Sequence, residues 1–208
     1  MERRDSIIKA ACPLFAKEGF RGVTTKKLAT EARISEALLY QHFPSKEAIY
    51  EEVLDMVSSF PDHLSEAISQ RPASTKTLVS LLHLLCYSVI HSPFEAESKG
   101  LITRMMLQSL LDDGEFAASF IERNIQSRLP HISACIEKAD QAGETIETNT
   151  PPETRFWLAH HALVCMKHIS IPGNNIVDYK QTKDELLISS LEFILRGVGF
   201  KNEVISKH

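Results

Sequence analysis

Apolar residues recur every three or four positions along most of the chain, and Gly, Pro and short polar clusters interrupt this pattern. Such a period places apolar side chains on one face of an α-helix. It predicts about nine helices, at residues 7–18, 24–32, 35–43, 45–60, 74–91, 99–111, 115–142, 154–168 and 180–197. We therefore expect a helical protein with a hydrophobic core.

Several details of the pattern lead to more specific expectations. Apolar side chains cover much of the circumference of helix 99–111, so this helix is expected to be central. Pro130 is expected to interrupt a longer helix, because proline removes a backbone hydrogen bond. The helix that starts near residue 45 is expected to continue past its proline as far as Ile68. A loop is expected at 172–175, and the tail after Phe200 is expected to fray.

Residues 24–46 have the pattern of two short helices joined by a tight turn. The hydroxyl of Thr24 or Thr25 can cap the start of the first helix, and Ser35 can cap the second. The apolar residues that can join the two helices are Leu28, Ala29, Leu39 and Phe43. The second helix then keeps a free side of polar, aromatic and small residues, which suits contact with the major groove of DNA.

Many fixed spacings agree across about the first 55 residues: Phe15-Ala16-x-x-Gly19-Phe20, Thr24-Thr25, Leu28-Ala29, Ile34-Ser35, Leu39-Tyr40-x-His42-Phe43 and Ser45-Lys46-Glu47. In these motifs the chain resembles the TetR family of one-component bacterial regulators. The resemblance implies an all-α fold with two domains. Residues 1–61 would form a three-helix helix-turn-helix domain with its motif at 24–43, and residues 62–208 a helical effector-binding and dimerisation domain.

The resemblance also implies a homodimer on double-stranded operator DNA, with a small molecule in the larger domain that weakens operator binding. We place the dimer contact on the last two long helices, because both carry broad apolar faces. The alternative is that these helices only close the core of a monomer. Repression is the expected mode of regulation.

Three residues depart from the usual family pattern. Arg33 stands at the turn position where Gly is usual, so either the turn differs or a residue with a Cβ is strained there. Arg33 could also reach a phosphate. Leu38 could touch a thymine methyl group, and Glu36 could accept a hydrogen bond from cytosine N4. These choices imply an unusual operator sequence.

The candidates for DNA contact fall into two groups. Donors suited to phosphate are Thr25, Lys26, Ser35, Tyr40 and Lys46, with Thr24 and Arg33 beside them. Candidates for reading bases are Glu36, Ala37, Leu38, Gln41 and His42. For each single residue, the alternative is a helix cap or a solvated surface position.

Net charge supports a local DNA-binding surface. The whole chain carries −4, but residues 1–50 hold nine Lys/Arg against six Asp/Glu, which is +3. The remaining residues hold fourteen against twenty-one, which is −7. The basic character is therefore concentrated around the motif, as contact with phosphate requires.

The effector is expected to be a hydrophobic or aromatic small molecule, because the candidate lining is apolar with few charges. The candidate ligand-binding residues are His83, Tyr87, Met105, Met106, Phe116, Phe120, Trp157 and His161. The competing interpretation is that the Met and aromatic residues among them fill the core.

His161, Cys165 and His168 fall on one helix face at spacings i, i+4 and i+7. Imidazole and thiolate are good ligands for zinc or copper, so a metal-responsive regulator is one alternative function. Three ligands on one helix rarely complete a tetrahedral site, and no acid lies nearby. We therefore expect these residues in a core, pocket or dimer interface, with no bound metal and no cofactor.

An enzyme is the competing class of protein. The sequence contains no G-x-S-x-G, no HExxH, no phosphate-binding loop and no dinucleotide fingerprint. The scattered cysteines and the start of the chain, without a secretory apolar core, predict a cytoplasmic protein with reduced thiols. No apolar run is long enough to span a membrane. A DNA-binding protein without an effector remains the other alternative.

Overall fold

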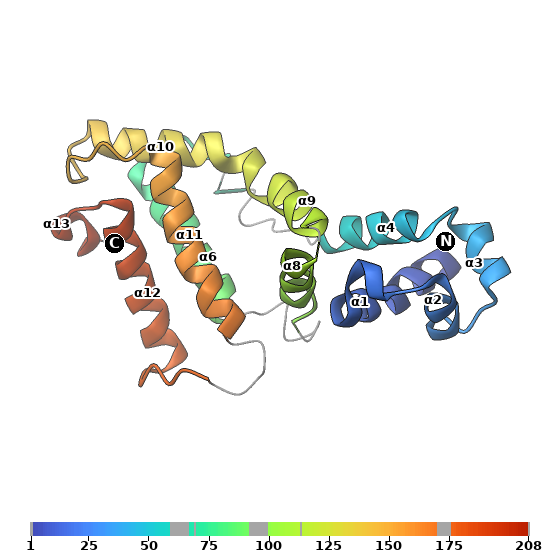
Figure 1. Ribbon diagram of the computed structural model, residues 1–208. Helices are drawn as coiled ribbons and strands as arrows, with labels where there is room; N and C mark the ends of the chain where they lie inside the picture. Colours follow the sequence, from blue (N-terminus) through green and yellow to red (C-terminus); the bar gives the residue numbers. More distant parts are fainter. Residues whose placement is uncertain are drawn as a thin grey trace. The chain divides into compact units, whose positions relative to one another are not determined.

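Figure 1 shows the computed structural model of the chain, which describes residues 2–58, 67–68, 70–91, 100–112, 114–169 and 176–207. Its helices are α1 (Glu2–Gly22), α2 (Thr25–Glu31), α3 (Glu36–His42), α4 (Lys46–Ser58), α6 (Thr75–Ile90), α8 (Leu101–Leu111), α9 (Glu115–Asn124), the 3-10 helix η1 (Gln126–Arg128), α10 (Leu129–Gln141), α11 (Pro152–Ile169), α12 (Lys183–Val198) and α13 (Asn202–Ile205). The described residues form no strand, only an isolated bridge between Thr145 and Phe200. The all-α fold is confirmed.

The chain divides into two compact units, and each is described here by itself. The first comprises Met1–Pro61 and Glu95–Ile125, and the second comprises Asp62–Phe94 and Gln126–His208. Helices α8 and α9 therefore group with the N-terminal helices. The predicted functional division at residues 1–61 and 62–208 stays a prediction. The expected helix between residue 61 and Ile68 and the expected loop at 172–175 lie largely outside the described residues.

The first unit has an aromatic centre. Phe15 of α1 packs edge-on against Tyr50 of α4, with ring centroids 4.9 Å apart, and Tyr50 lies 6.1 Å from the ring of Phe116 in α9. Helix α1 supplies the buried residues Ile7, Ile8, Ala11 and Cys12 to the same core. Regular helical geometry in α1 is interrupted at Gly19, where φ is 70°. Rings from three helices thus tie α4 and α9 to α1.

The prediction that α8 is a central helix is wrong. Met105 is buried, but Leu110 and Leu111 are 60% and 83% exposed. Helix α8 packs on α1 and α9 through one side. Its apolar residues also occur on the remaining circumference, which these two helices do not cover. An apolar circumference shows only that burial is favourable, since which face is covered depends on the neighbouring helices.

The second unit surrounds α6, which contacts α10, α11 and α12. Two expectations about this unit are wrong. Pro130 does not interrupt a helix, because the break lies at Ile125 and η1, and Pro130 occupies the first turn of α10, where its missing N–H is not needed. The chain after Phe200 does not fray, because α13 forms there and buries Val204 and Ile205.

A buried cation joins three parts of the second unit. The side chain of Arg155 is 5% exposed and makes a bidentate ion pair with Asp140, with N–O distances of 3.0 and 2.5 Å. It also donates to the carbonyl of Val198, and Thr145 donates to the same carboxylate at 2.6 Å. Burial raises the pKa of Asp140, but the hydrogen bonds from Arg155 and Thr145 and the charge of Arg155 outweigh it and hold that pKa below its usual value.

No described helix combines the length and apolar character that a membrane crossing requires.

Candidate nucleic-acid interface

Helices α2 and α3 begin at the hydroxyl caps that the sequence predicts. Thr24 Oγ1 accepts a hydrogen bond from the Lys27 amide at 3.2 Å, and Ser35 Oγ accepts one from the Leu38 amide at 3.1 Å. Both caps satisfy backbone groups that have no partner within the helix. Leu28 and Leu39 are each 1% exposed and hold the inner sides of the two helices in the core.

The turn between the two helices requires a left-handed backbone at Arg33, where φ is 57°. The Ile34 amide donates to the Ala29 carbonyl at 2.9 Å, and the Arg33 amide donates to the Thr30 carbonyl at 3.1 Å. These two bonds are the pair that ends a helix in a Schellman motif, whose left-handed position is usually Gly. Of the two explanations for Arg33, the second therefore holds: a residue with a Cβ occupies the left-handed position of the turn, and its strain is tolerated.

The outer side of α3 is open. Glu36, Ala37, Tyr40 and Gln41 are exposed, and Leu38 and His42 are half-buried. Arg33 and Lys26 are also exposed. Of the predicted base-reading residues, Glu36, Ala37 and Gln41 are therefore accessible, on a helix that is held in the core by Leu39. Their roles in DNA contact stay predictions.

A chain of hydrogen bonds joins the start of α2 to α3. The Tyr40 hydroxyl donates to Thr25 Oγ1 at 3.4 Å, and Thr25 Oγ1 donates to Glu36 Oε1 at 2.9 Å. Three predicted DNA contacts are thus bonded to one another in the free protein. The sequence pattern gave no sign of this link, because residues 25 and 36 lie on different helices.

Lys46 has a structural role that sequence reasoning missed. Its Nζ donates to the carbonyls of Phe20 and Val23 at 2.8 and 3.1 Å, and lies 4.0 Å from the centroid of the Phe20 ring. The ammonium thereby satisfies one carbonyl in the last turn of α1 and one directly after the helix. Its phosphate contact stays a prediction, with one of three ammonium protons left for it.

Arg4 was not among the predicted site residues. Its Nη1 donates to the His42 carbonyl at 2.9 Å, its Nη2 lies 2.5 Å from Glu52 Oε1, and its guanidinium stacks on the Phe43 ring at 4.2 Å. Arg4 therefore fixes the end of α3 to α1 and α4. A basic residue in the first turn of an N-terminal helix gives no local signal for this role.

The predicted ligand-binding residues are divided between the two units. Met105, Met106, Phe116 and Phe120 belong to the first unit, and His83, Tyr87, Trp157 and His161 belong to the second. Met105 and Phe116 are buried core residues, which agrees with the competing interpretation, whereas His83 and His161 are exposed. Their role in ligand binding stays a prediction.

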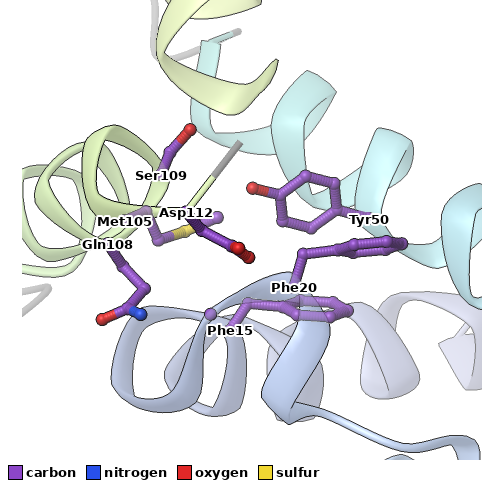
Figure 2. A pocket seen from close by; sticks show the side chains of 8 residues that line it. Phe15, Phe20, Tyr50, Met105, Gln108, Ser109 and Asp112 are labelled. Atoms are coloured by element: carbon purple, nitrogen blue, oxygen red, sulfur yellow. The ribbon is translucent and has the colours of Figure 1, made fainter. Parts of the chain in front are cut away.

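A small pocket lies in the first unit between α1, α4 and α8 (Figure 2). Phe15, Phe20, Tyr50 and Met105 supply its apolar lining, and Gln108, Ser109 and Asp112 supply its polar lining. Its volume of about 10 Å³ holds about one water molecule. Met105 is the one predicted ligand residue in this lining, and the pocket is too small for a drug-sized effector.

The metal alternative finds no support in the described residues, among which no group of three His, Cys, Asp or Glu side chains is placed to hold an ion. Cys165 and His161 are exposed on α11, and His168 is half-buried. All four cysteines are free, and burial raises the pKa of Cys12 and of Cys86 to about 12, which keeps both thiols protonated.

A capped helix, a left-handed turn and a second helix with an open outer side together form a helix-turn-helix motif. This motif defines a class of DNA-binding proteins. Residues 7–53 match the family model described as bacterial regulatory proteins of the tetR family. These residues therefore form a TetR-type N-terminal domain.

The chain is also similar to curated relatives and to solved structures over more than these residues. Nucleoid occlusion factor SlmA of Aliivibrio fischeri is 30% identical over 123 residues, which are 58% of this chain and 60% of that protein. The match thus spans about 60% of the relative's length. NalD of Pseudomonas aeruginosa, the secondary repressor of the MexAB-OprM multidrug efflux pump, is similar in structure with a TM-score of 0.67, 19% identity and 97% coverage of both chains.

FadR from Bacillus subtilis, a transcriptional regulator solved in complex with stearoyl-CoA, has a TM-score of 0.59 to this chain at 20% identity. The likeness covers 92% of this chain and 97% of FadR. At these identities the similarity to NalD and FadR shows the fold, which extends through both units of the chain.

Proposed function

We propose that the protein is a transcriptional repressor that binds a palindromic operator as a homodimer and is released by a small molecule. The observation that carries the proposal is the open side of α3, which the Schellman turn at Arg33 holds away from the core. Such a helix fits the major groove, and a twofold dimer brings two of them to successive half-sites. The proposed activity is regulation and not catalysis.

The proposed dimer contact lies on α11 and α12. Three large apolar side chains on these helices are exposed: Leu158 (64%), Ile188 (61%) and Phe193 (65%). Exposed apolar groups of this size on neighbouring helices are typical of a surface that a partner covers. A second copy of the chain is the partner that a palindromic operator requires.

The proposed effector is a hydrophobic small molecule, with a fatty acyl-CoA as the first compound to test. FadR from Bacillus subtilis, which shares the fold, is described in complex with stearoyl-CoA. The effector acts by favouring a conformation in which the two recognition helices no longer match successive grooves. It shifts binding only as far as its affinities for the two conformations differ.

The test of dimeric DNA binding uses in vitro selection of an operator, fluorescence anisotropy and sedimentation velocity. We expect a palindromic selected site, and expect Phe193→Glu to give a monomer with at least a hundredfold weaker operator binding. Leu111→Glu is the matched control, because it places the same charge on an exposed apolar residue of α8. Equal loss of binding in both variants contradicts the proposed interface.

The test of effector release adds stearoyl-CoA to the operator complex. We expect a fall in operator affinity that saturates with ligand, while the affinity for a scrambled duplex changes less. Free coenzyme A serves as the control for the polar part of the molecule. Operator affinity that is the same with and without a panel of hydrophobic ligands rejects the effector and leaves a regulator without one.

A second candidate function comes from the curated relatives, which are named nucleoid occlusion factors. One of them, from Shewanella pealeana, aligns over 149 residues at 26% identity, well beyond the helix-turn-helix. A protein with that function is expected to occupy many sites across the chromosome. Chromatin immunoprecipitation separates the two candidates, since a repressor of one operon is expected at one or a few promoters.

A further inference from the structure

The carboxylate of Glu36 is engaged in the free protein by a residue of the other motif helix. It accepts the Thr25 hydroxyl proton at 2.9 Å, and Thr25 in turn accepts the Tyr40 hydroxyl proton at 3.4 Å. Both donations run in the same direction, towards the one negative charge in the chain of bonds. Thr25 and Tyr40 are the hydroxyls expected to contact phosphate, and Glu36 is the residue expected to contact a base.

These bonds conflict with phosphate contact. A hydroxyl group has a single proton, and a phosphate oxygen can only accept one. While the Thr25 proton is donated to Glu36, it is not available to DNA. The carboxylate also repels any phosphate that approaches within a few ångströms of Thr25. Both effects act on every DNA sequence alike.

We propose that Glu36 is a specificity-determining residue that masks the phosphate-binding hydroxyls of Thr25 and Tyr40. This inference rests on the proposed function as a DNA-binding protein. The mask opens when the Glu36 carboxylate finds a hydrogen-bond donor on a base edge in the major groove, such as the amino group of cytosine or adenine. Breaking the bond between Thr25 and Glu36 costs free energy, and only a DNA sequence that offers this donor compensates for that cost. Sites without the donor are therefore bound more weakly.

The central variant is Glu36→Gln, which keeps the size of the side chain and removes its charge. Binding is measured by fluorescence anisotropy at one fixed salt concentration, on the selected operator and on a scrambled duplex of equal length. We expect affinity for the scrambled duplex to rise about tenfold, because the Thr25 hydroxyl no longer gives its proton to a carboxylate and can donate it to a phosphate. We expect affinity for the operator to stay level or fall, so that the ratio of the two drops at least tenfold.

Two controls separate masking from a general effect of charge. Glu31→Gln removes the same charge from an exposed residue at the end of α2, and we expect it to change affinity for both duplexes to a similar and small extent. Glu36→Asp keeps the charge but withdraws it from Thr25 by one methylene. We expect this variant to gain affinity for the scrambled duplex, in the direction of Glu36→Gln.

A double-mutant cycle tests the bond itself. In a Thr25→Val background there is no hydroxyl to mask, so the gain from Glu36→Gln on the scrambled duplex is expected to shrink to about the gain from Glu31→Gln. A gain that remains tenfold in this background means that Glu36 acts through charge alone, and the masking proposal is then wrong. The cycle is interpreted on proteins with equal circular dichroism spectra and melting temperatures.

Failure of this inference is distinct from failure of the proposed function. If the wild-type protein binds neither duplex, the proposed function is wrong and the role of Glu36 is wrong with it. If the wild type discriminates between the duplexes and Glu36→Gln leaves the ratio of affinities unchanged, DNA binding stands and the mask is rejected.

Discussion

The α2–α3 motif and the cluster around Arg155 use polar side chains in opposite ways. In the cluster, Arg155 is 5% exposed and its charge is matched by Asp140 and by the Val198 carbonyl. In the motif, Tyr40 is 51% exposed, and its bond to Thr25 is long at 3.4 Å. In the Arg155 cluster the polar groups stabilise the fold, whereas in the α2–α3 motif they stay accessible to a partner.

This difference in burial predicts where substitutions change the free energy of unfolding and where they change DNA affinity. A buried charge that loses its partner keeps the whole cost of its desolvation. An exposed polar group that loses a weak bond is rehydrated at little cost. Substitutions in the Arg155 cluster should therefore lower the free energy of unfolding, and most substitutions in the motif should change DNA affinity instead.

The largest expected effect is that of Asp140→Ala, which leaves the Arg155 guanidinium buried without its carboxylate. We expect a loss of about 3 kcal/mol in the free energy of unfolding, at the lower end of the range for a broken buried pair because Asp140 is itself partly exposed. Urea unfolding followed by the fluorescence of Trp157, the single tryptophan, reports on this unit.

The control for Asp140→Ala is Glu192→Gln, which breaks an exposed pair with Arg196 in the same unit. We expect that variant to lose about 0.5 kcal/mol or less. Similar losses in the two variants would mean that the Arg155 pair is no stronger than a surface ion pair, and the comparison between the two regions would fail.

The next effect concerns His160, a polar residue of the second unit whose Nδ1 has no hydrogen-bond partner in the described structure. Burial, with a smaller contribution from the charge of His161, lowers its pKa from 6.5 to about 4. Between these pH values the unfolded chain binds a proton that the folded chain does not. Stability is therefore full above pH 6.5, and about 3 kcal/mol of it should be lost as the pH falls to about 4.

The measurement is urea unfolding between pH 7 and pH 4.5, in the wild type and in His160→Gln, which does not titrate. We expect a shallower pH dependence in the variant. Asp140 does not interfere, because its lowered pKa contributes stability that is lost only below about pH 4. Identical slopes in the two proteins would show that His160 is not held neutral by burial.

Lys46→Met tests whether Lys46, although it lies next to the motif, stabilises the fold as Arg155 does. Its ammonium donates to the Phe20 and Val23 carbonyls, so its loss is expected to lower the free energy of unfolding by about 2 kcal/mol. Faster amide hydrogen exchange around residues 20–23 should accompany it. The salt dependence of DNA binding should stay unchanged, whereas a slope reduced by about one would support the predicted phosphate contact.

Apart from the Glu192→Gln control, the smallest effect on stability is expected for Arg33→Gly, and it has the opposite sign. Glycine adopts the left-handed backbone of this position without strain, so the free energy of unfolding should rise by about 1 kcal/mol. If Arg33 contacts a phosphate, DNA affinity should fall on operator and scrambled duplex alike. A variant that is less stable than the wild type would contradict the strain at this turn.

Local patterns were sufficient for the elements that position the site. The caps at Thr24 and Ser35 follow from residue chemistry over four or five positions. The left-handed backbone at Arg33 does not, because an arginine there left two explanations open that only the structure decided. The helix at Thr75–Ile90 follows from its Ser74 cap and apolar stripe. Such features depend on neighbours in sequence, so one sequence is enough to find them.

Features that depend on residues far apart in sequence could not be predicted. Arg155 and Asp140 lie on different helices, as do Thr25 and Glu36, and nothing in their local sequence marks them as partners. The exposure of Leu111 was missed for the same reason, since an apolar side chain is buried only if another element covers it. Lys46 was assigned to DNA by its place in the motif, while its two carbonyl partners depend on how α1 ends.

The bridge between Thr145 and Phe200 has a practical consequence for handling the gene. The Lys201 amide donates to the Glu144 carbonyl at 3.0 Å, and the Ile146 amide donates to the Gly199 carbonyl at 2.8 Å. The segment between α12 and α13 is thus joined by two backbone hydrogen bonds to a loop some 55 positions upstream. A stop codon at residue 199 removes both hydrogen bonds, whereas truncation after Lys201 keeps them and removes only α13.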